Sequence, residues 1–198
     1  MEEQVFYDDV FVMPPFPSVF TKKKVGASGT VDEIVAMGEL CHVESKGFCD
    51  RIVSIGSGTT ISSSGFRALI TSLGDLDSIV SSGKFARITS SGNFADIFSS
   101  GYFSTIFSIG NDTKIRSTGR RSVIVSSGNR VKVCASVGSW ITLTEWDETD
   151  DEYCDIITRV KTEFVDGVKI KGDAWYTFFR GKFVEIEENT DLSSDSLK

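Results

Sequence analysis

Glycine recurs at every ninth position through about half of the chain, without a break. The glycines stand at positions 29, 38, 47, 56, 65, 74, 83, 92, 101, 110, 119 and 128. An internal period of this kind indicates that the fold is built from one small unit stacked on copies of itself. The period therefore constrains the architecture more strongly than any local conformational propensity does.

The residues at fixed distances from each glycine form columns. The fifth residue is Ile or Val in every repeat, from Ile34 to Val133, and the seventh is Ser in every repeat from Ser45 to Ser126. Because side chains alternate between the two faces of a strand, the third, fifth and seventh residues share one face. That face is expected to point inward, with the branched side chains stacked between successive coils.

Two kinds of corner alternate along the repeats. After every second glycine comes a bulky or basic residue, as in Phe48, Phe66, Lys84 and Arg120, whereas the other glycines precede small or polar residues such as Asp75. The residue before glycine alternates as well, and Met, Ile or Leu precedes most of the small polar corners. The structural period is therefore eighteen residues, with two repeats in each turn of the chain.

We predict an all-β fold, a nonapeptide-repeat β-solenoid with two repeats in each coil of about 18 residues. Residues 29–136 then form about six coils, and each buried Ile or Val contributes about 1.5–3 kcal/mol. Glycine is expected at the corners because a positive φ or a close backbone approach excludes a Cβ atom there. The inward serines are expected to hydrogen-bond to backbone groups near the corners.

The flanking segments are expected to cover the ends of the solenoid. Residues 1–28 are predicted to be an N-terminal cap, in which residues 5–20 form a short apolar cover. Residues 137–188 are predicted to be an antiparallel β cap with strands at 154–165, 168–171, 174–179 and 182–186, and the tryptophans at 140, 146 and 175 are expected to seal the core. Residues 189–198 are predicted to be a disordered tail.

The C-terminal motifs carry a resemblance to known sequences. The order "GSW", then an acidic break, "VDGVKIKGDAWY" and a final "GKFVEI" resembles uncharacterised proteins of phages and host-associated bacteria. In these proteins a short-repeat β-solenoid is closed by a small β cap. The resemblance covers residues 29–188 and implies a fold and a phage or mobile-element setting, but no established activity.

Composition favours a soluble protein of the cytoplasm, or of the host cytoplasm if the chain is phage-encoded. No apolar run approaches the length of about 18–20 residues that a membrane-spanning helix needs, and the acidic start "MEEQVFYDDVFVM" does not resemble a signal peptide. Cys41, Cys49, Cys134 and Cys154 have no metal-binding spacing. We expect free thiols, no metal and no cofactor.

Catalytic and ligand motifs are weak. The nonapeptide period is shared with calcium-binding β-rolls, but the acidic column that binds calcium in those proteins is missing here. His42 is the only histidine available as a base and is expected on the surface beside Glu44. Asp32, Asp50 and Asp77 share the third place after glycine and are interpreted as polar residues at the ends of coils rather than catalytic acids. An ice-binding array is excluded because the regular hydroxyl column points inward.

Three surface features are candidates for function. The first is a ridge of exposed aromatic side chains, which usually marks an interface or, alternatively, local packing over the corners. The second is a group of basic residues in the last coils, and the third is an acidic loop. The candidate interface residues are Phe48, Phe66, Phe85, Phe98, Tyr102, Phe103 and Phe107; the basic residues are Lys114, Arg116, Arg120, Arg121, Arg130 and Lys132; the acidic residues are Asp147, Glu148, Asp150, Asp151 and Glu152.

The leading hypothesis is a non-catalytic interaction protein that acts through protein–protein contact or self-association, and we expect a homo-oligomer. A specialised form of this hypothesis is an inhibitor of a host nucleic-acid-binding or defence enzyme, with the acidic cap imitating nucleic acid. The alternatives are a filament-forming scaffold similar to bactofilins and, third, a carbohydrate-active β-helix enzyme. We do not expect direct nucleic-acid binding, a small-molecule substrate or a membrane partner.

Overall fold

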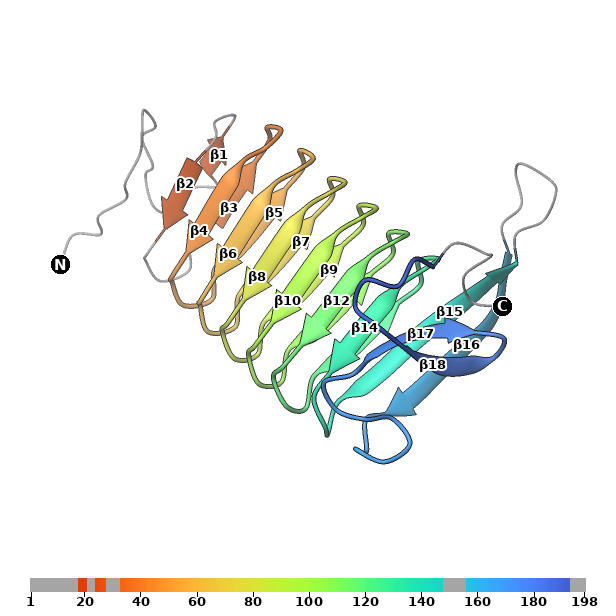
Figure 1. Cartoon of the computed structure of the whole chain (residues 1–198). Helices are drawn as coiled ribbons and strands as arrows, with labels where there is room; N and C mark the ends of the chain where they lie inside the picture. Colours follow the sequence, from red (N-terminus) through yellow and green to blue (C-terminus); the bar gives the residue numbers. More distant parts are fainter. Residues whose placement is uncertain (1–17, 21–23, 28–32, 148–155, 193–198) are drawn as a thin grey trace.

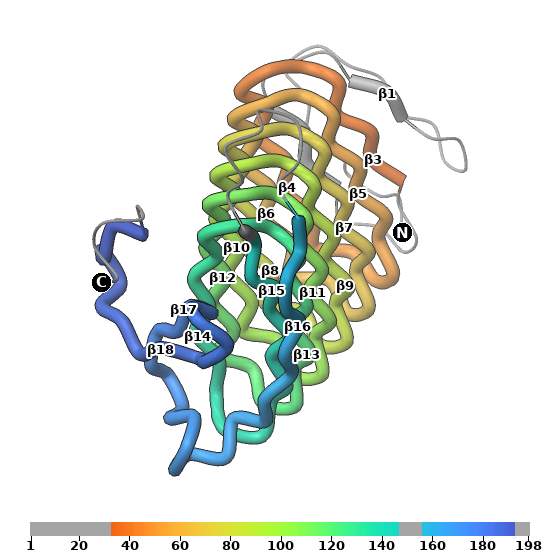
Figure 2. The backbone as a smooth tube through the Cα atoms, turned by 90° about the vertical axis from the view of Figure 1, so that its right-hand side faces the viewer, coloured from red at the N-terminus to blue at the C-terminus, as the bar shows by residue number. Residues whose placement is uncertain are grey.

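The computed structural model describes residues 18–20, 24–27, 33–147 and 156–192. The described chain is all β, and its strands form flattened coils that stack side by side along one axis (Figure 1). Figure 2 shows the coils nested behind one another, each with two straight sides and two corners. This architecture confirms the predicted β-solenoid with coils of about 18 residues. No helix that could cross a membrane occurs among the described residues.

The strands form two sheets of nine, and every coil contributes one strand to each. The first sheet runs in the order β1 (Ser18–Phe20), β3 (Glu33–Ala36), β5 (Arg51–Ser54), β7 (Leu69–Ser72), β9 (Arg87–Ser90), β11 (Thr105–Ser108), β13 (Val123–Ser126), β15 (Trp140–Asp147) and β16 (Ile156–Phe164). The second runs in the order β18 (Lys182–Ile186), β17 (Trp175–Phe179), β14 (Lys132–Ala135), β12 (Lys114–Ser117), β10 (Asp96–Ser99), β8 (Ser78–Ser81), β6 (Thr60–Ser63), β4 (His42–Ser45) and β2 (Lys24–Ala27).

Parallel pairing at an offset of eighteen residues places each branched side chain on its counterpart in the next coil. Ile52 pairs with Ile70, and Ile70 with Ile88, and the same register holds on the second sheet. Every isoleucine of this column from Ile52 to Ile124 is 0% exposed. Because the two sheets face each other, these side chains form one continuous core between them.

The glycine column is explained by close approach of neighbouring coils. A Cβ atom at Gly92 would lie 1.8 Å from the carbonyl oxygen of Gly74, and one at Gly101 would lie 1.9 Å from that of Gly83. These glycines do not have positive φ. Of the two predicted reasons for glycine, the close approach of the neighbouring coil is therefore confirmed, whereas a positive φ is not the reason.

Positive φ occurs instead two residues after each glycine from Gly38 to Gly128. The φ angles there lie between 52° and 63° at ten non-glycine residues, among them Leu76, Phe85 and Phe94, and only Gly58 in this column is glycine. The left-handed conformation costs an L-residue roughly 1–2 kcal/mol. Hydrogen bonds between coils offset this cost, because the amide of Phe85 donates to the Tyr102 carbonyl at 2.9 Å and the corners from Leu40 to Asp112 repeat the contact.

Of the ten inward serines from Ser45 to Ser126, five hydrogen-bond to side chains and not to the backbone as predicted, and the buried hydroxyls of Ser54, Ser81, Ser90 and Ser126 have no hydrogen-bond partner. The Ser99 hydroxyl donates across the corner to Ser104 at 3.0 Å, and that of Ser117 donates to Ser122 at the same distance. Only Ser63 follows the prediction, by accepting a 3.4 Å bond from the Gly65 amide. At corners whose third residue after glycine is Ser or Thr, that residue already donates to the corner carbonyl, as Ser104 does to Gly101.

Two buried aspartates take the place of these hydroxyl partners. Asp50 accepts a hydrogen bond from Ser45 across one corner, and Asp77 accepts one from Ser72 across the other. The Asp77 carboxylate also accepts the Thr59 amide at 2.7 Å. Burial raises the pKa of Asp77, although the bonds from Ser72 and Thr59 oppose this effect.

Two hairpins close the C-terminal end by continuing the two sheets. β15 pairs in parallel with β13 and antiparallel with β16, while β17 pairs antiparallel with both β14 and β18. The inward face of edge strand β16 carries Arg159, Lys161 and Glu163, which lie opposite Glu145, Leu143 and Ile141. Inward charges on an edge strand oppose pairing with another chain.

Two details of the predicted cap are wrong. Residues 168–171 form a loop rather than a strand, because the Asp166 carboxylate accepts the amides of Val168, Lys169 and Ile170 and leaves few donors for a sheet. Trp140 lies on the outer face, 48% exposed, against the Phe164 ring at 4.9 Å.

The end of the core is covered by side chains from both hairpins. Leu143 of β15 and Tyr176 and Phe178 of β17 are buried and belong to the same cluster as the stacked isoleucines. Trp175 is also buried, at 8% exposed, but Trp146 is only partly buried and its indole nitrogen donates to the Ser127 carbonyl at 2.9 Å.

The structure also describes parts of the predicted terminal segments. Within residues 1–28, β1 and β2 pair in parallel with β3 and β4, so both sheets extend beyond the first nonapeptide. The predicted apolar cover lies otherwise outside the described residues. Within the predicted tail, residues 189–192 are described, and Leu192 is buried at 7% exposed.

Replacing a stacked glycine tests the close approach of the coils. We expect Gly92→Ala to lower the free energy of unfolding by about 1–3 kcal/mol, the range for inserting a methyl group into a closely packed site. The new Cβ meets backbone atoms of Gly74 and Asp75, which cannot rotate away. Chemical denaturation measures the change, with Ser91→Ala at the same corner as the control. Equal stability of the two variants would contradict the stacking.

Asp77→Asn tests the raised pKa of the buried carboxyl. A pKa that is higher in the folded than in the unfolded protein means that stability falls as pH rises above about 3.9, the unfolded value, through the folded pKa. The variant, which keeps the Thr59 contact, should therefore gain stability relative to the wild type as pH increases. Denaturation curves from pH 3 to pH 7 measure this trend. Asp96→Asn, on the exposed face of β10, removes one negative charge at the surface and is the control for net charge.

Candidate functional site

One edge of the solenoid carries a ladder of aromatic rings. We call it the aromatic edge, and it comprises the corners at residues 46–49, 64–67, 82–85, 100–103 and 118–121. The rings of Phe48 and Phe66 stack with centroids 5.0 Å apart, Phe66 meets Phe85 at 5.4 Å, and Phe85 stacks on Phe103 at 5.1 Å. These separations are close to the strand spacing of about 4.8 Å, so the coil stack itself sets the spacing of the rings.

The rings of the ladder remain accessible although they touch one another. Phe48, Phe85 and Phe103 are 42–49% exposed, and Tyr102 beside them is 48% exposed. Contact between neighbouring rings covers their faces and leaves their outer edges in water. Local packing therefore accounts for only part of the aromatic surface.

Cations flank the rings along the whole aromatic edge. The guanidinium of Arg121 lies 5.5 Å from the Phe103 centroid, and the Lys84 ammonium lies 5.9 Å from that of Tyr102. Both contacts are within the range of cation–π attraction. The exposed charged side chains at these five corners are all cations: Lys46, Arg67, Lys84, Arg120 and Arg121.

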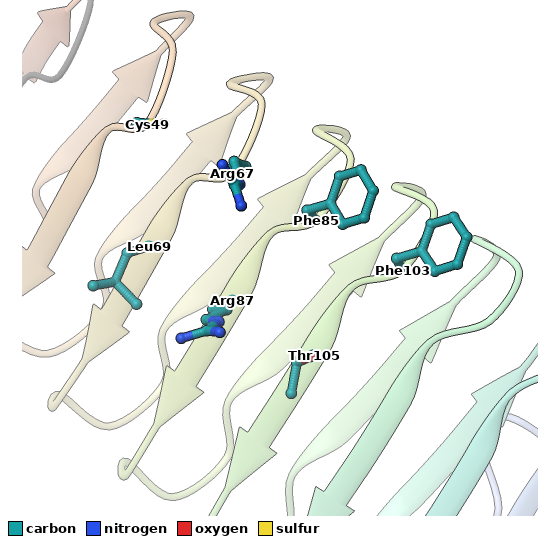
Figure 3. Close-up of a pocket in the computed structure, with 7 residues that line it drawn as sticks. All are labelled: Cys49, Arg67, Leu69, Phe85, Arg87, Phe103 and Thr105. Carbon is teal, nitrogen blue, oxygen red and sulfur yellow. The ribbon is translucent and has the colours of Figure 1, made fainter.

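A shallow depression of about 570 Å³ lies beside the ladder. Figure 3 shows that it spans the corners and the outer face of the first sheet, with Phe85 and Phe103 side by side at its rim. Its floor combines apolar and guanidinium groups, which suits an apolar side chain with a nearby anionic group. The lining residues are Cys49, Arg67, Leu69, Phe85, Arg87, Phe103 and Thr105.

Two of the predicted interface residues lie away from the corners. Phe107, 47% exposed, lies in β11 on the outer face of the first sheet. Phe98 lies in β10 of the second sheet and is only partly exposed. The structure therefore brings together Phe48, Phe66, Phe85 and Phe103 with Tyr102 next to them, and separates Phe98 from this group.

The predicted basic residues are divided among three places. Arg120 and Arg121 belong to the aromatic edge, whereas Arg130 lies at the opposite edge. There Arg130 forms a bidentate pair with Asp112, with both nitrogen–oxygen distances at 2.8 Å.

Lys114, Arg116 and Lys132 lie on the second sheet, in β12 and β14. The Lys114 ammonium contacts the Glu188 carboxylate at 2.5 Å and lies 5.1 Å from the Trp175 ring, and Lys132 donates to the Glu188 carbonyl. The hydrogen bond from Lys114 lowers the pKa of Glu188. The C-terminal segment thus pairs with the lysines of this group.

The predicted acidic loop is mostly beyond the described residues. Asp147 is the last residue of β15, and Glu148, Asp150, Asp151 and Glu152 lie outside the described residues. Within the described part of the cap, Glu163 contacts Lys169 at 2.6 Å and Lys161 at 3.3 Å. The bond from Lys169 lowers the pKa of Glu163.

The residues considered for catalysis and metal binding lie apart. His42 lies in β4 and is partly exposed, whereas Asp50 and Asp77 are buried inside opposite corners; Asp32 lies outside the described residues. Cys41, Cys49 and Cys134 are free thiols, and burial raises the pKa of Cys134 to about 11. Among the described residues no three His, Cys, Asp or Glu side chains gather in a way that could hold a metal ion.

The opposite edge is also apolar, which the sequence analysis did not predict. We call it the aliphatic edge, and it comprises the corners at residues 37–40, 55–58, 73–76, 91–94, 109–112 and 127–130. The residues before the glycines and two places after them are 46–68% exposed where they are apolar: Met37, Leu40, Ile55, Leu73, Leu76, Phe94 and Ile109. The signal in the sequence was the Met, Ile or Leu that recurs before glycine at intervals of eighteen residues.

Amide side chains fix the aliphatic edge in register. The Asp75 carboxylate accepts a hydrogen bond from the backbone N–H of Asn93 in the next coil at 2.7 Å. The Asn93 side-chain oxygen accepts a hydrogen bond from the backbone N–H of Asn111 at 2.9 Å. The Asn111 side-chain oxygen accepts one from the backbone N–H of Asn129 at 2.8 Å. Each of these corners is therefore tied to the next one by a side chain as well as by the backbone.

Comparison of the chain with known proteins gives no relative. No family model, no curated protein and no solved structure matches the sequence or the fold.

Proposed function

We propose that the protein is a non-catalytic β-solenoid that acts by protein–protein contact along its aromatic edge. The observation that carries this proposal is the ladder from Phe48 to Phe103, in which all rings but the partly buried Phe66 are 42–49% exposed, with cations beside them. Aromatic and arginine side chains dominate the binding energy of protein interfaces. An exposed strip of both is therefore best explained as a surface that another protein covers.

The backbone that carries the aromatic edge is held by hydrogen bonds between coils, which favours a binding role. Each ring lies on a corner that is hydrogen-bonded to the next coil, as the Phe85 amide is to Tyr102 and the Phe103 amide to Arg120. Neighbouring rings also restrict one another's rotation. A partner would therefore lose less side-chain entropy on binding than it would against isolated exposed phenylalanines.

The inward acids and hydroxyls support the non-catalytic part of the proposal. Asp50 and Asp77 bond to serines inside the coils and are 0% and 1% exposed. The repeated serines of the seventh place point into the same core. These groups stabilise the corners from within and are not presented to a substrate.

End-to-end stacking, as in a bactofilin-like filament, is less well supported. Such stacking needs bare strand edges, whereas β16 turns charged side chains inward at the C-terminal end. At this end the Glu145 carboxylate forms an ion pair with Arg159 at 2.7 Å and accepts hydrogen bonds from the backbone amides of Arg180 and Gly181. These contacts tie the β17–β18 turn to the β15–β16 hairpin at this end of the solenoid.

Site-specific photo-crosslinking in cells tests the proposed function. A photoreactive phenylalanine analogue at Phe48 or Tyr102 should form covalent adducts with protein, because both positions project from the aromatic edge. The adducts are detected as a mass increase on denaturing gels and are identified by mass spectrometry.

Val80, 37% exposed on the outer face of β8, is the matched control position. We expect adduct yields several-fold higher at Phe48 and Tyr102 than at Val80. Equal yields at the three positions, or no adduct at all, would refute a role of the aromatic edge in protein contact.

A further inference from the structure

We propose that the partner of the aromatic edge is the aliphatic edge of a second copy of this chain. The inference rests on the proposed function and names its partner. It requires that the two edges match in apolar extent, in charge and in spacing. Each of these properties can be compared on the described residues.

The apolar side chains of the two edges occupy the same coils. On the aromatic edge they run from Phe48 to Phe103, and the next corner carries Arg120 and Arg121 instead. On the aliphatic edge they run from Met37 to Ile109, and the next corner carries Ser127 and Arg130. Both edges therefore become polar at these later corners. The apolar part of one edge can thus cover the apolar part of the other.

The charges of the two edges are opposite. The charged side chains at the corners of the aromatic edge are all cations, such as Arg67 and Lys84, and Lys46 is paired with Glu44 at 2.9 Å. The aliphatic edge exposes Glu39 and Asp75, while its later pair, Asp112 with Arg130, is internally neutral. Complementary charge adds little energy to each exposed pair, but it favours aromatic-to-aliphatic docking over contact between two identical edges.

The spacing of the two edges matches because both arise from the same coils. Each edge presents one corner per eighteen residues, and the aromatic centroids repeat at 5.0–5.4 Å. The Asp75 and Asn ladder holds the aliphatic corners to the same rise. Side chains of one edge can therefore lie between or opposite those of the other along several coils.

The arrangement of the edges determines the kind of assembly. The two sets of corners lie on opposite sides of the flattened coil, as the loops at the two ends of the strands in Figure 1 show. A contact between opposite and different surfaces leaves one free edge of each kind on every pair of molecules. Such a heterologous contact continues into an open lateral row of solenoids.

Two edge variants test this arrangement. Phe85→Asp with Phe103→Asp removes the aromatic edge, and Leu76→Arg with Phe94→Arg removes the aliphatic edge. All four positions have positive φ, and the same column already holds Asp112, Arg67 and Arg121, so the replacements suit the backbone. Circular dichroism and thermal melting confirm that both variants are folded.

Sedimentation velocity over a range of concentrations measures the assembly. The wild type should form a series of oligomers that grows with concentration and shrinks with added salt. Each variant alone should be a monomer. An equimolar mixture of the two should form a dimer and nothing larger, because only one intact pair of edges is present.

Each other outcome overturns the inference. A wild type that stays monomeric at all concentrations would refute self-association, and a variant that associates alone would show that two identical edges meet. A mixture that stays monomeric would also refute the contact. If the inference fails but Tyr102 still crosslinks to a different protein, the proposed function stands; if Tyr102 forms no adduct, both fail.

Discussion

The close stacking of glycine corners on one another is the constraint on which the rest of the structure depends. The Gly92 Cα lies so near the Gly74 carbonyl that no side chain fits, and this contact recurs at every corner from Gly56 to Gly128. It keeps each coil at eighteen residues and in register with the next. Only in that register does Ile70 lie between Ile52 and Ile88 with no exposure to water.

The same register determines what the surface presents. Because coils superimpose, a residue type repeated at intervals of eighteen becomes a continuous strip, such as the rings from Phe48 to Phe103. The residue two places after glycine adopts a left-handed conformation at nearly every corner, and Leu76 and Phe94 are more than half exposed there. The conformational cost at these corners is met by hydrogen bonds between coils. The edges thus expose apolar side chains on a rigid frame.

Strand residues could be predicted from the sequence because the two-residue alternation of a strand needs no tertiary information. The inward Ile and Ser columns, the two repeats per coil and the antiparallel hairpins at the C-terminus followed from it. Corner residues obey no such alternation, so the left-handed column, the aliphatic edge and the partners of the inward serines were missed. The segment 168–171 has the alternation of a strand, but it forms a loop because one side chain, Asp166, accepts its backbone amides locally, and the alternation does not reveal this contact. The basic residues of the last coils are close in sequence but lie on different surfaces, because consecutive repeats form opposite sides of each coil.

Spin labelling at paired corners tests the eighteen-residue coil most directly. Labels that replace Phe85 and Phe103 lie on adjacent coils of the aromatic edge, about one strand spacing of 4.8 Å apart. Labels that replace Phe85 and Phe94 lie on opposite edges. The account predicts strong spin–spin exchange in the electron paramagnetic resonance spectrum of the first pair and none in that of the second. Exchange in the second pair would mean that one coil holds nine residues, and it would contradict both the stacking and the surface derived from it.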